Sequence, residues 1–271
     1  MQGSSDAVHG LDDAIALAGE PGSWTASIAS TWFLIADTPH GGVSAALLMN
    51  AAKLLDPSRS IRTATVQLMA PMLGEITVEA VKLRETRSLS VVSVTASVEG
   101  RTAATASIVM GSTIESTMRR DFANLPDVPV VEDCPDLVSM APDMFPRFVT
   151  NHLDFRAALG VPFSGGDNPE LAGWIRLKQP RPVDDLVVAV LLDALPSAIS
   201  VIAHGFKIAP TVEYSLAFDQ AAIAQVGSDQ WTLCHARNWA AGDGWSFEDA
   251  DLFTADGTLL AKGRQLRRLG F

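Results

Sequence analysis

Two polar residues of the C-terminal half stand in predicted strands, where their side chains could do chemistry. Gln265 shares a strand face with small and apolar residues, so its amide should be partly buried and must find hydrogen-bond partners. Glu213 shares the polar face of another strand with Thr211 and Ser215. A buried carboxylate can act as a general base, and a buried amide can orient a water molecule. The competing interpretations are a satisfied interface amide for Gln265 and a solvated residue or ion-pair partner for Glu213.

A second feature is His40-Gly41-Gly42, which comes directly before an apolar helix. The N-terminus of a helix offers unpaired N–H groups and a positive potential, so these residues could hold an electron-rich group. The alternative is that the two glycines only permit the turn and that His40 caps the helix or packs against it.

Polar residues also interrupt the apolar stripes of two predicted helices. Asn50 lies in the stripe that begins at Val43, and Asp193 lies in the stripe that begins at Leu186. Asp193 stands three residues before Pro196, so a helix-end residue bonded to a neighbouring loop is the simpler interpretation.

The elements that must position these side chains are two helices and two sets of strands. Helical spacing predicts one helix over residues 43–54 and another over 186–193. A weakly alternating stretch at 22–32 predicts a first strand. Short links predict antiparallel pairing among the remaining strands, at 63–70, 74–85, 88–99, 101–110, 151–157, 172–178, 211–218, 230–239, 245–254 and 258–268.

The same order of elements occurs in both halves of the chain, which indicates two like units. Gly100 aligns with Gly257, and Ala104 aligns with Ala261. A proline-rich stretch without periodicity separates the halves and predicts a crossover. We therefore predict an N-terminal unit at 1–115, a crossover linker at 116–148 and a C-terminal unit at 149–271.

Composition and charge exclude several classes of function. The apolar fraction of 48% predicts a substantial core, and the net charge of −11 argues against a nucleic-acid partner. The longest apolar run, at 186–192, is too short to span a membrane, and residues 1–6 carry no secretory signal. Cys134 and Cys234 show neither disulfide nor metal spacing, so we expect a cytoplasmic protein without a bound metal. No serine-hydrolase elbow, phosphate loop or dinucleotide fingerprint is present.

Five segments in a common order resemble the type II acyl-CoA thioesterases. They are His40-Gly41-Gly42 with its helix, Gln67-Leu-Met-Ala-Pro71, Arg84-Glu-Thr-Arg-Ser88, Gly173-Trp-Ile-Arg-Leu177 and Asp256-Gly-Thr-Leu-Leu-Ala-Lys-Gly-Arg-Gln265. The resemblance covers nearly the whole chain except the crossover. It implies an α+β fold, the double hotdog: two long helices, each wrapped by antiparallel sheet, with the sheets joined into one pseudo-dimer. It also implies hydrolysis of acyl-CoA to free acid and CoA without a cofactor.

The resemblance implies a catalytic set as well. In the family, an Asp, a Ser or Thr and a Gln from three strands of the second unit orient and activate a water molecule. The Gln falls on Gln265, the Asp position on Glu213 and the hydroxyl position on Trp239. A tryptophan N–H only donates a hydrogen bond, so Trp239 cannot replace a hydroxyl as an acceptor.

Five residues are predicted to contact the substrate. Backbone N–H groups near His40, Gly41 and Gly42 would polarise the thioester carbonyl, as in hotdog thioesterases. Asn50 and Asp193 lie on the central helices. Asp193 is a reserve candidate for the acid, because some hotdog enzymes carry a catalytic carboxylate on this helix. The basic residues near the C-terminus form a solvated edge or meet the phosphates of CoA; they are Lys262, Arg264, Arg267 and Arg268.

Two other functions compete with thioester hydrolysis. A non-catalytic double hotdog that binds acyl-CoA or another acyl ligand is favoured by Trp239. A hydratase or dehydratase would need a paired Asp and His at one site, and the sequence shows no such spacing for His40, His152, His204 and His235. The sequence does not indicate the number of subunits, so both a monomer and a homo-oligomer that assembles through the sheets are alternatives.

Overall fold

The computed structural model describes residues 10–34, 38–118, 121–205 and 207–270. Residues 1–9 of the first predicted unit and 119–120 of the predicted crossover lie outside the described residues. The N-terminal half contributes β1 (Ala18–Glu20), β2 (Ser23–Ala26), β3 (Ser60–Leu68), β4 (Ile76–Glu85), β5 (Leu89–Val98) and β6 (Arg101–Gly111). The C-terminal half contributes β7 (Leu153–Leu159), β8 (Glu170–Leu177), β9 (Thr211–Phe218), β10 (Thr232–Gly242), β11 (Trp245–Thr254) and β12 (Leu259–Arg268).

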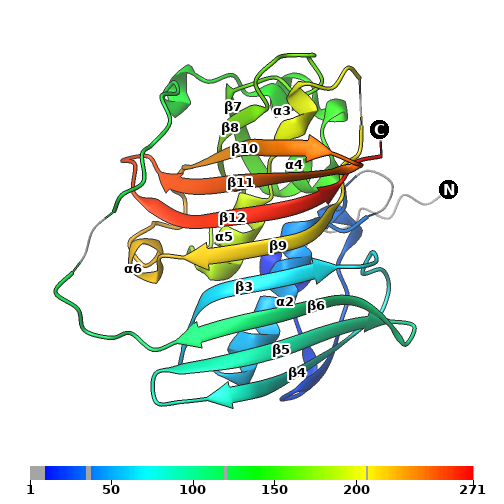
Figure 1. Ribbon diagram of the computed structural model, residues 1–271, viewed down its shortest axis with the longest axis vertical. Helices are drawn as coiled ribbons and strands as arrows, with labels where there is room; N and C mark the ends of the chain where they lie inside the picture. Colours follow the sequence, from blue (N-terminus) through cyan, green and yellow to red (C-terminus); the bar gives the residue numbers. More distant parts are fainter. Residues whose placement is uncertain (1–9, 35–37, 119–120, 206, 271) are drawn as a thin grey trace.

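These strands form one antiparallel sheet in the order β1-β2-β4-β5-β6-β3-β9-β12-β11-β10-β8-β7 (Figure 1). From the middle outward, β3-β6-β5-β4-β2-β1 on one side matches β9-β12-β11-β10-β8-β7 on the other. The two halves therefore repeat one arrangement, and the strands β3 and β9 join them. Their register pairs Thr63 with Ala217 and Gln67 with Glu213. The predicted α+β double hotdog is confirmed.

Two central helices, α2 (Gly41–Leu55) and α5 (Asp185–Leu192), pack against each other and against one face of the sheet. We call this the inner face and the opposite one the outer face. The first turn of α5 is capped by the Asp184 carboxylate, which accepts from the N–H groups of Leu186 and Val187. Short helical segments complete the chain: α1 (Leu11–Ala14), α3 (Leu137–Met140), α4 (Arg147–His152) and α6 (Gln220–Ile223), and 3-10 turns at Ser30–Trp32, Val131–Asp133, Pro142–Met144 and Ala198–Val201.

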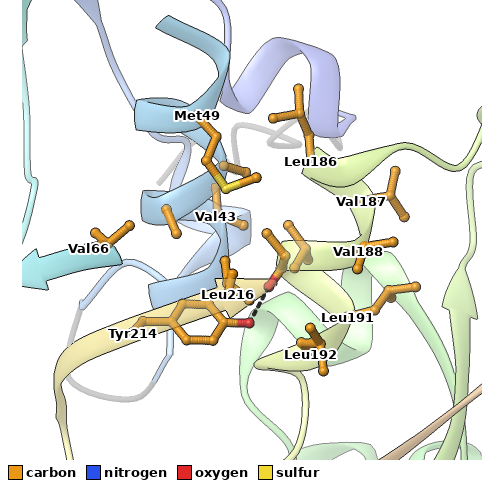
Figure 2. Close-up of a cluster of buried hydrophobic side chains, with 14 of the residues drawn as sticks. Val43, Met49, Val66, Leu186, Val187, Val188, Leu191, Leu192, Tyr214 and Leu216 are labelled. Atoms are coloured by element: carbon orange, nitrogen blue, oxygen red, sulfur yellow. Dashed lines mark hydrogen bonds between the residues drawn. The ribbon is translucent and has the colours of Figure 1, made fainter. Parts of the chain in front are cut away.

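The two helices run antiparallel, and both ends of their contact carry polar interactions. Lys53, near the end of α2, forms an ion pair of 2.5 Å with Asp185 at the start of α5. Figure 2 shows the apolar centre, where Val43 and Met49 of α2 face the side chains of α5. The buried hydroxyl of Tyr214 donates to the Ala189 carbonyl at 2.9 Å and so anchors β9 to α5 (Figure 2). At the other end of this contact, the start of α2 lies next to the end of α5.

The segment between the halves covers part of the outer face. Cys134 packs in a buried cluster with Trp174, Leu233 and Phe253 of three neighbouring strands. The Trp174 indole donates to the Pro129 carbonyl at 2.9 Å. This segment is therefore bound to the sheet along its second part, and it buries the outer-face side chains of Trp174, Leu233 and Phe253.

Most predicted strands coincide with observed ones, and the two differences lie in the edge regions. The stretch at 22–32 is strand only over Ser23–Ala26 and continues as a turn of 3-10 helix. The strand predicted at 151–157 begins as the end of α4, and β7 starts at Leu153. Within the described residues, no helix is long and apolar enough to span a membrane.

We predict that His152 makes the fold acid-sensitive. Its ring is buried and stacked on Trp32 with 3.7 Å between centroids, and burial lowers the pKa of His152 to about 4. An unfolded histidine gains its proton near pH 6.5, so the free energy of unfolding should fall between pH 6.5 and 4, by at most about 3 kcal/mol from this residue. Urea unfolding at several pH values would measure this. His152→Phe keeps the stacking and should flatten the slope, and an unchanged slope would contradict the assignment.

Candidate active site

The carboxylate of Asp193 is the centre of a buried polar cluster at the contact between α2 and α5. Asp193 caps the C-terminal end of α5 and is 8% exposed. Its Oδ2 accepts from the backbone N–H of Gly42 at 2.7 Å, in the first turn of α2. Its Oδ1 accepts from the Gln265 amide at 2.8 Å. The positive end of α2 therefore faces an acidic side chain that comes from the other half of the chain.

Gln265 connects this carboxylate to a hydroxyl. Its Nε2 donates to Asp193, while its Oε1 accepts from the Thr211 hydroxyl at 2.5 Å. The carboxylate requires the NH₂ end of the amide on its side, so the carbonyl end must face Thr211. Gln265 is 2% exposed, whereas Thr211 is partly exposed. Asp193, Gln265 and Thr211 thus form a chain of hydrogen bonds from the interior to the surface.

His40 supports Asp193 from the N-terminal half. Its Nε2 lies 2.8 Å from the Asp193 carbonyl oxygen and 3.4 Å from Oδ2, and its ring stacks on Phe148. Burial lowers the pKa of His40, while the nearby Asp193 acts in the opposite direction. A neutral imidazole with its proton on Nε2 satisfies this geometry, because the carbonyl oxygen can only accept.

Arg267 links Asp193 to a second buried carboxylate. Its Nε donates to Glu248 Oε1 at 2.6 Å, and its guanidinium lies 3.4 Å from Asp193 Oδ1. Glu248 Oε2 accepts from the Ser197 hydroxyl at 2.7 Å and from the Ala198 N–H at 2.8 Å. Burial would lower the pKa of Arg267, but the carboxylates of Glu248 and Asp193 raise it on balance. The arginine is therefore a buried, charged group with two acidic partners.

Models of a known family match both halves of the chain. The acyl-CoA thioesterase N-terminal domain matches residues 28–111, and the acyl-CoA thioesterase C-terminal domain matches residues 131–268. The chain belongs to the acyl-CoA thioesterase family. None of the curated proteins compared with it matches.

Solved structures share the fold of this thioesterase family member along its whole length. A hotdog protein of unknown function from Alicyclobacillus acidocaldarius is 27% identical, with a TM-score of 0.87 over 97% of this chain and 98% of the other. A candidate thioesterase II from Thermobifida fusca is 21% identical, with a TM-score of 0.81 over 96% and 97%. The acyl-CoA thioesterase II TesB2 of Mycobacterium marinum is 17% identical, with a TM-score of 0.74 over 96% and 98%.

The structure does not bring Glu213 to Gln265. In the register of β9 and β12, Gln265 pairs with Tyr214 and both face α5, whereas Glu213 pairs with Leu266 on the outer face. There the Glu213 carboxylate accepts from Gln67 at 3.4 Å across the β3–β9 junction. The two residues predicted to share a water molecule therefore lie on opposite faces of the sheet.

Trp239 is also separate from the cluster. It lies on the outer face of β10, is 54% exposed, and has the Arg237 guanidinium 5.1 Å from its ring centroid. β10 has a bulge between Asn238 and Ala240, where its pairing with β11 shifts by one residue. Asn50 lies apart as well, because its side chain donates to the Ile15 carbonyl at 2.9 Å.

Thr211 belongs to the cluster, although strand alternation predicts that it lies on the other face of the sheet. Simple alternation places Thr211 on the face of Glu213, away from Gln265. In the structure, Leu266 pairs with Glu213 but Arg267 pairs with Thr211, so Val212 is an extra residue in β9. This β-bulge turns Thr211 to the inner face. A local sequence signal for the bulge is absent, since Val212 is an ordinary strand residue.

The predicted role of the α2 N-terminus needs a correction at one atom. The N–H of Gly42 donates to Asp193 and is therefore not free to polarise a carbonyl group. Gly41 also lies beside this carboxylate, since a Cβ at Gly41 would be 2.8 Å from Asp193 Oδ2.

A hollow of about 390 Å³ lies at the other end of β9 and β12, lined by Asp219 and Lys262 among others. In the described parts of the chain, no group of three or more His, Cys, Asp and Glu residues could hold a metal ion.

Proposed function

We propose that the protein hydrolyses an acyl-CoA thioester to a free carboxylic acid and CoA, with Asp193, Gln265 and Thr211 activating the water. The single observation that carries this proposal is the hydrogen-bonded chain that joins these three side chains. Membership of the acyl-CoA thioesterase family supports it, because the resemblance implies a catalytic Asp, a Ser or Thr hydroxyl and a Gln. All three residue types are then present, with Asp193 and Thr211 in place of Glu213 and Trp239.

Gln265 would determine which groups bind the water. Since the Thr211 hydroxyl donates its proton to Gln265 Oε1, the free lone pairs of Thr211 can only accept. Asp193 is an acceptor as well. A water molecule between them would donate one hydrogen to each, which directs its lone pair toward the substrate. The chain therefore orients the nucleophile before the reaction begins.

The reaction then proceeds by general-base catalysis. The oxygen of the water bonds to the thioester carbon while Asp193 takes its proton, which gives a tetrahedral oxyanion. Re-formation of the carbonyl group breaks the C–S bond, and the proton passes from Asp193 to the sulfur of the leaving CoA. The products are one carboxylic acid and one CoA thiol. His40 orients Asp193 through its carbonyl oxygen.

The oxyanion would be stabilised by the start of α2. The positive end of this helix lies next to Asp193, and one of its N–H groups, that of Gly42, already binds the carboxylate. We assign the role of carbonyl donor to the neighbouring N–H of Gly41, where a Cβ would lie 2.8 Å from Asp193 Oδ2. This assignment keeps the predicted contribution of the His40-Gly41-Gly42 segment and limits it to the N–H of Gly41.

The direct test is release of the CoA thiol from a series of acyl-CoA esters of increasing chain length, followed with a thiol reagent. Turnover of at least one ester supports the proposal. Absence of turnover with every ester, in a folded preparation, contradicts it. Tight binding without turnover would instead identify an acyl-CoA binding protein.

Thr211 provides a test of the water-binding geometry. Thr211→Val keeps the shape of the side chain but removes the hydroxyl, so kcat should fall by about 100-fold. Thr211→Ser keeps the hydroxyl and should stay within about fivefold of the wild type, since the side chain can still accept from the water. Steady-state kinetics of both variants would measure this. Equal activity of the valine and serine variants would remove Thr211 from the mechanism.

A further inference from the structure

We propose that Arg267 and Glu248 are a positioning pair for the catalytic carboxylate: Arg267 holds Asp193 in place, and Glu248 holds Arg267. The inference rests on the proposed function and adds two residues to it. Neither residue touches the proposed position of the water molecule, so both would act through Asp193.

The geometry gives Arg267 contact with one member of the catalytic set, Asp193, and with the chain segment that leads to another, Thr211. Its guanidinium lies 3.4 Å from Asp193 Oδ1, the same oxygen that accepts from Gln265. Another of its nitrogen atoms, Nη1, donates to the Ala209 carbonyl at 3.1 Å, two residues before Thr211. One planar group therefore fixes the carboxylate and the chain segment that leads into the β9 bulge. A lysine, with a single point charge, could not hold both in this way.

Glu248 determines where the guanidinium can lie. It bonds Arg267 Nε at 2.6 Å, and its other oxygen is fixed by Ser197 and Ala198. Glu248 is 3% exposed and Arg267 is 8% exposed, so neither charge has solvent as an alternative partner. Because Glu248 is itself fixed, it also fixes the orientation of the Arg267 guanidinium. In this orientation the guanidinium faces the Asp193 carboxylate.

The charge balance explains why two acidic residues are buried beside one arginine. Removal of Arg267 alone would leave the Glu248 and Asp193 carboxylates without a cation in the interior, which would destabilise the fold. The other titratable groups near Asp193 are His40 from the start of α2, Tyr214 from β9 and Cys234 from β10. Burial raises the pKa of both Tyr214 and Cys234, and the pKa of His40 is lowered. Since these three stay neutral near pH 7, Arg267 is the cation among these groups that lies beside the Asp193 carboxylate.

The test is the charge-neutral double variant Arg267→Met/Glu248→Gln, assayed with the acyl-CoA ester that the wild type cleaves fastest. Because both charges are removed together, the fold should remain. We expect KM within threefold of the wild type, kcat lowered by 10- to 100-fold, and the acidic limb of the kcat–pH profile moved to higher pH by about one unit. A merely structural pair would not move the pH profile.

A matched control lies on the same two strands, three residues before Arg267 and one residue after Glu248. Arg264 Nε donates to Asp249 at 2.9 Å, but Arg264 is exposed and faces away from Asp193. Arg264→Met/Asp249→Asn should leave kcat and the pH profile unchanged. Arg267→Lys is a second variant, which keeps the charge but not the planar contacts. It should lower kcat by about 10-fold with an unshifted acidic limb.

The outcomes separate this inference from the proposed function. A folded double variant with wild-type kcat and pH profile would overturn the inference. If the double variant does not fold, Arg267→Lys becomes the test. A wild-type kcat in that variant would overturn the inference. If Asp193→Asn itself keeps wild-type activity, the proposed function of the site fails instead, whatever Arg267 does.

Discussion

Asp193→Asn should lower kcat for acyl-CoA hydrolysis by about 1000-fold or more, because it removes the only proposed proton acceptor for the attacking water. The substituted amide has nearly the same shape, so the substrate should still bind and KM should change little. At Asp193 the amide would also place an NH₂ group near the N–H of Gly42 or the NH₂ of Gln265. Some loss of stability is therefore expected, and kcat should be measured on protein that thermal unfolding shows to be folded.

The matched control is Glu213→Gln, which makes the same chemical change on a carboxylate of the outer face. Its partners are Gln67 and Ser215, and neither touches the Asp193 cluster. We expect activity within twofold of the wild type. Large and equal losses in both variants would mean that the reaction uses the outer face, and a fully active Asp193→Asn would exclude Asp193 as the base.

The elements of the fold were predictable because each depends on neighbours in the sequence. The strand β11 alternates between inner and outer residues along its length, and the helix α2, which helical spacing predicts over 43–54, spans Gly41–Leu55. The repetition of the two halves also follows from order alone. Predicting these features requires no knowledge of contacts between residues that are distant in the sequence.

The site was only partly predictable because its contacts join distant residues. Gln265 could be identified from its polar side chain on an apolar strand face, and it does lie in the cluster. Asp193 was considered a helix-end residue, which it is, but its partner Gly42 lies 151 positions away. Local spacing cannot report that the end of α5 meets the start of α2.

Two further residues illustrate the same limit. The bulge at Val212 reverses the side of the sheet on which Thr211 lies, so alternation assigns it to the wrong face. The sequence groups Arg267 with neighbouring basic residues that form a solvated edge or meet the phosphates of CoA, yet Arg267 is 8% exposed and bonded to Glu248. Burial of a charge depends on a partner, and the partner is on another strand.

The close contact between α2 and α5 predicts a large effect of a single methyl group at Gly42. A Cβ at this position would lie 2.8 Å from the Ala189 carbonyl oxygen and 2.9 Å from the Cα of Val190. Both are backbone atoms of α5, so they cannot move aside as a flexible side chain could. Gly242→Ala is the matched control, since a Cβ there meets nothing within 4 Å. We expect the control to change the free energy of unfolding by no more than about 0.5 kcal/mol.

Gly42→Ala should destabilise the protein by about 2 kcal/mol, because the overpacking cost of up to about 3 kcal/mol exceeds the gain of about 1 kcal/mol from replacing glycine inside a helix. The same displacement would lengthen the bond from the Gly42 N–H to Asp193 and the contact from His40 to the Asp193 carbonyl. Activity should therefore fall together with stability, and urea unfolding with CoA-release kinetics on one preparation would measure both. If stability fell while kcat stayed at the wild-type value, the position of α2 would not control the carboxylate. A variant as stable as the wild type would show that the two helices lie farther apart than the contact at Ala189 requires.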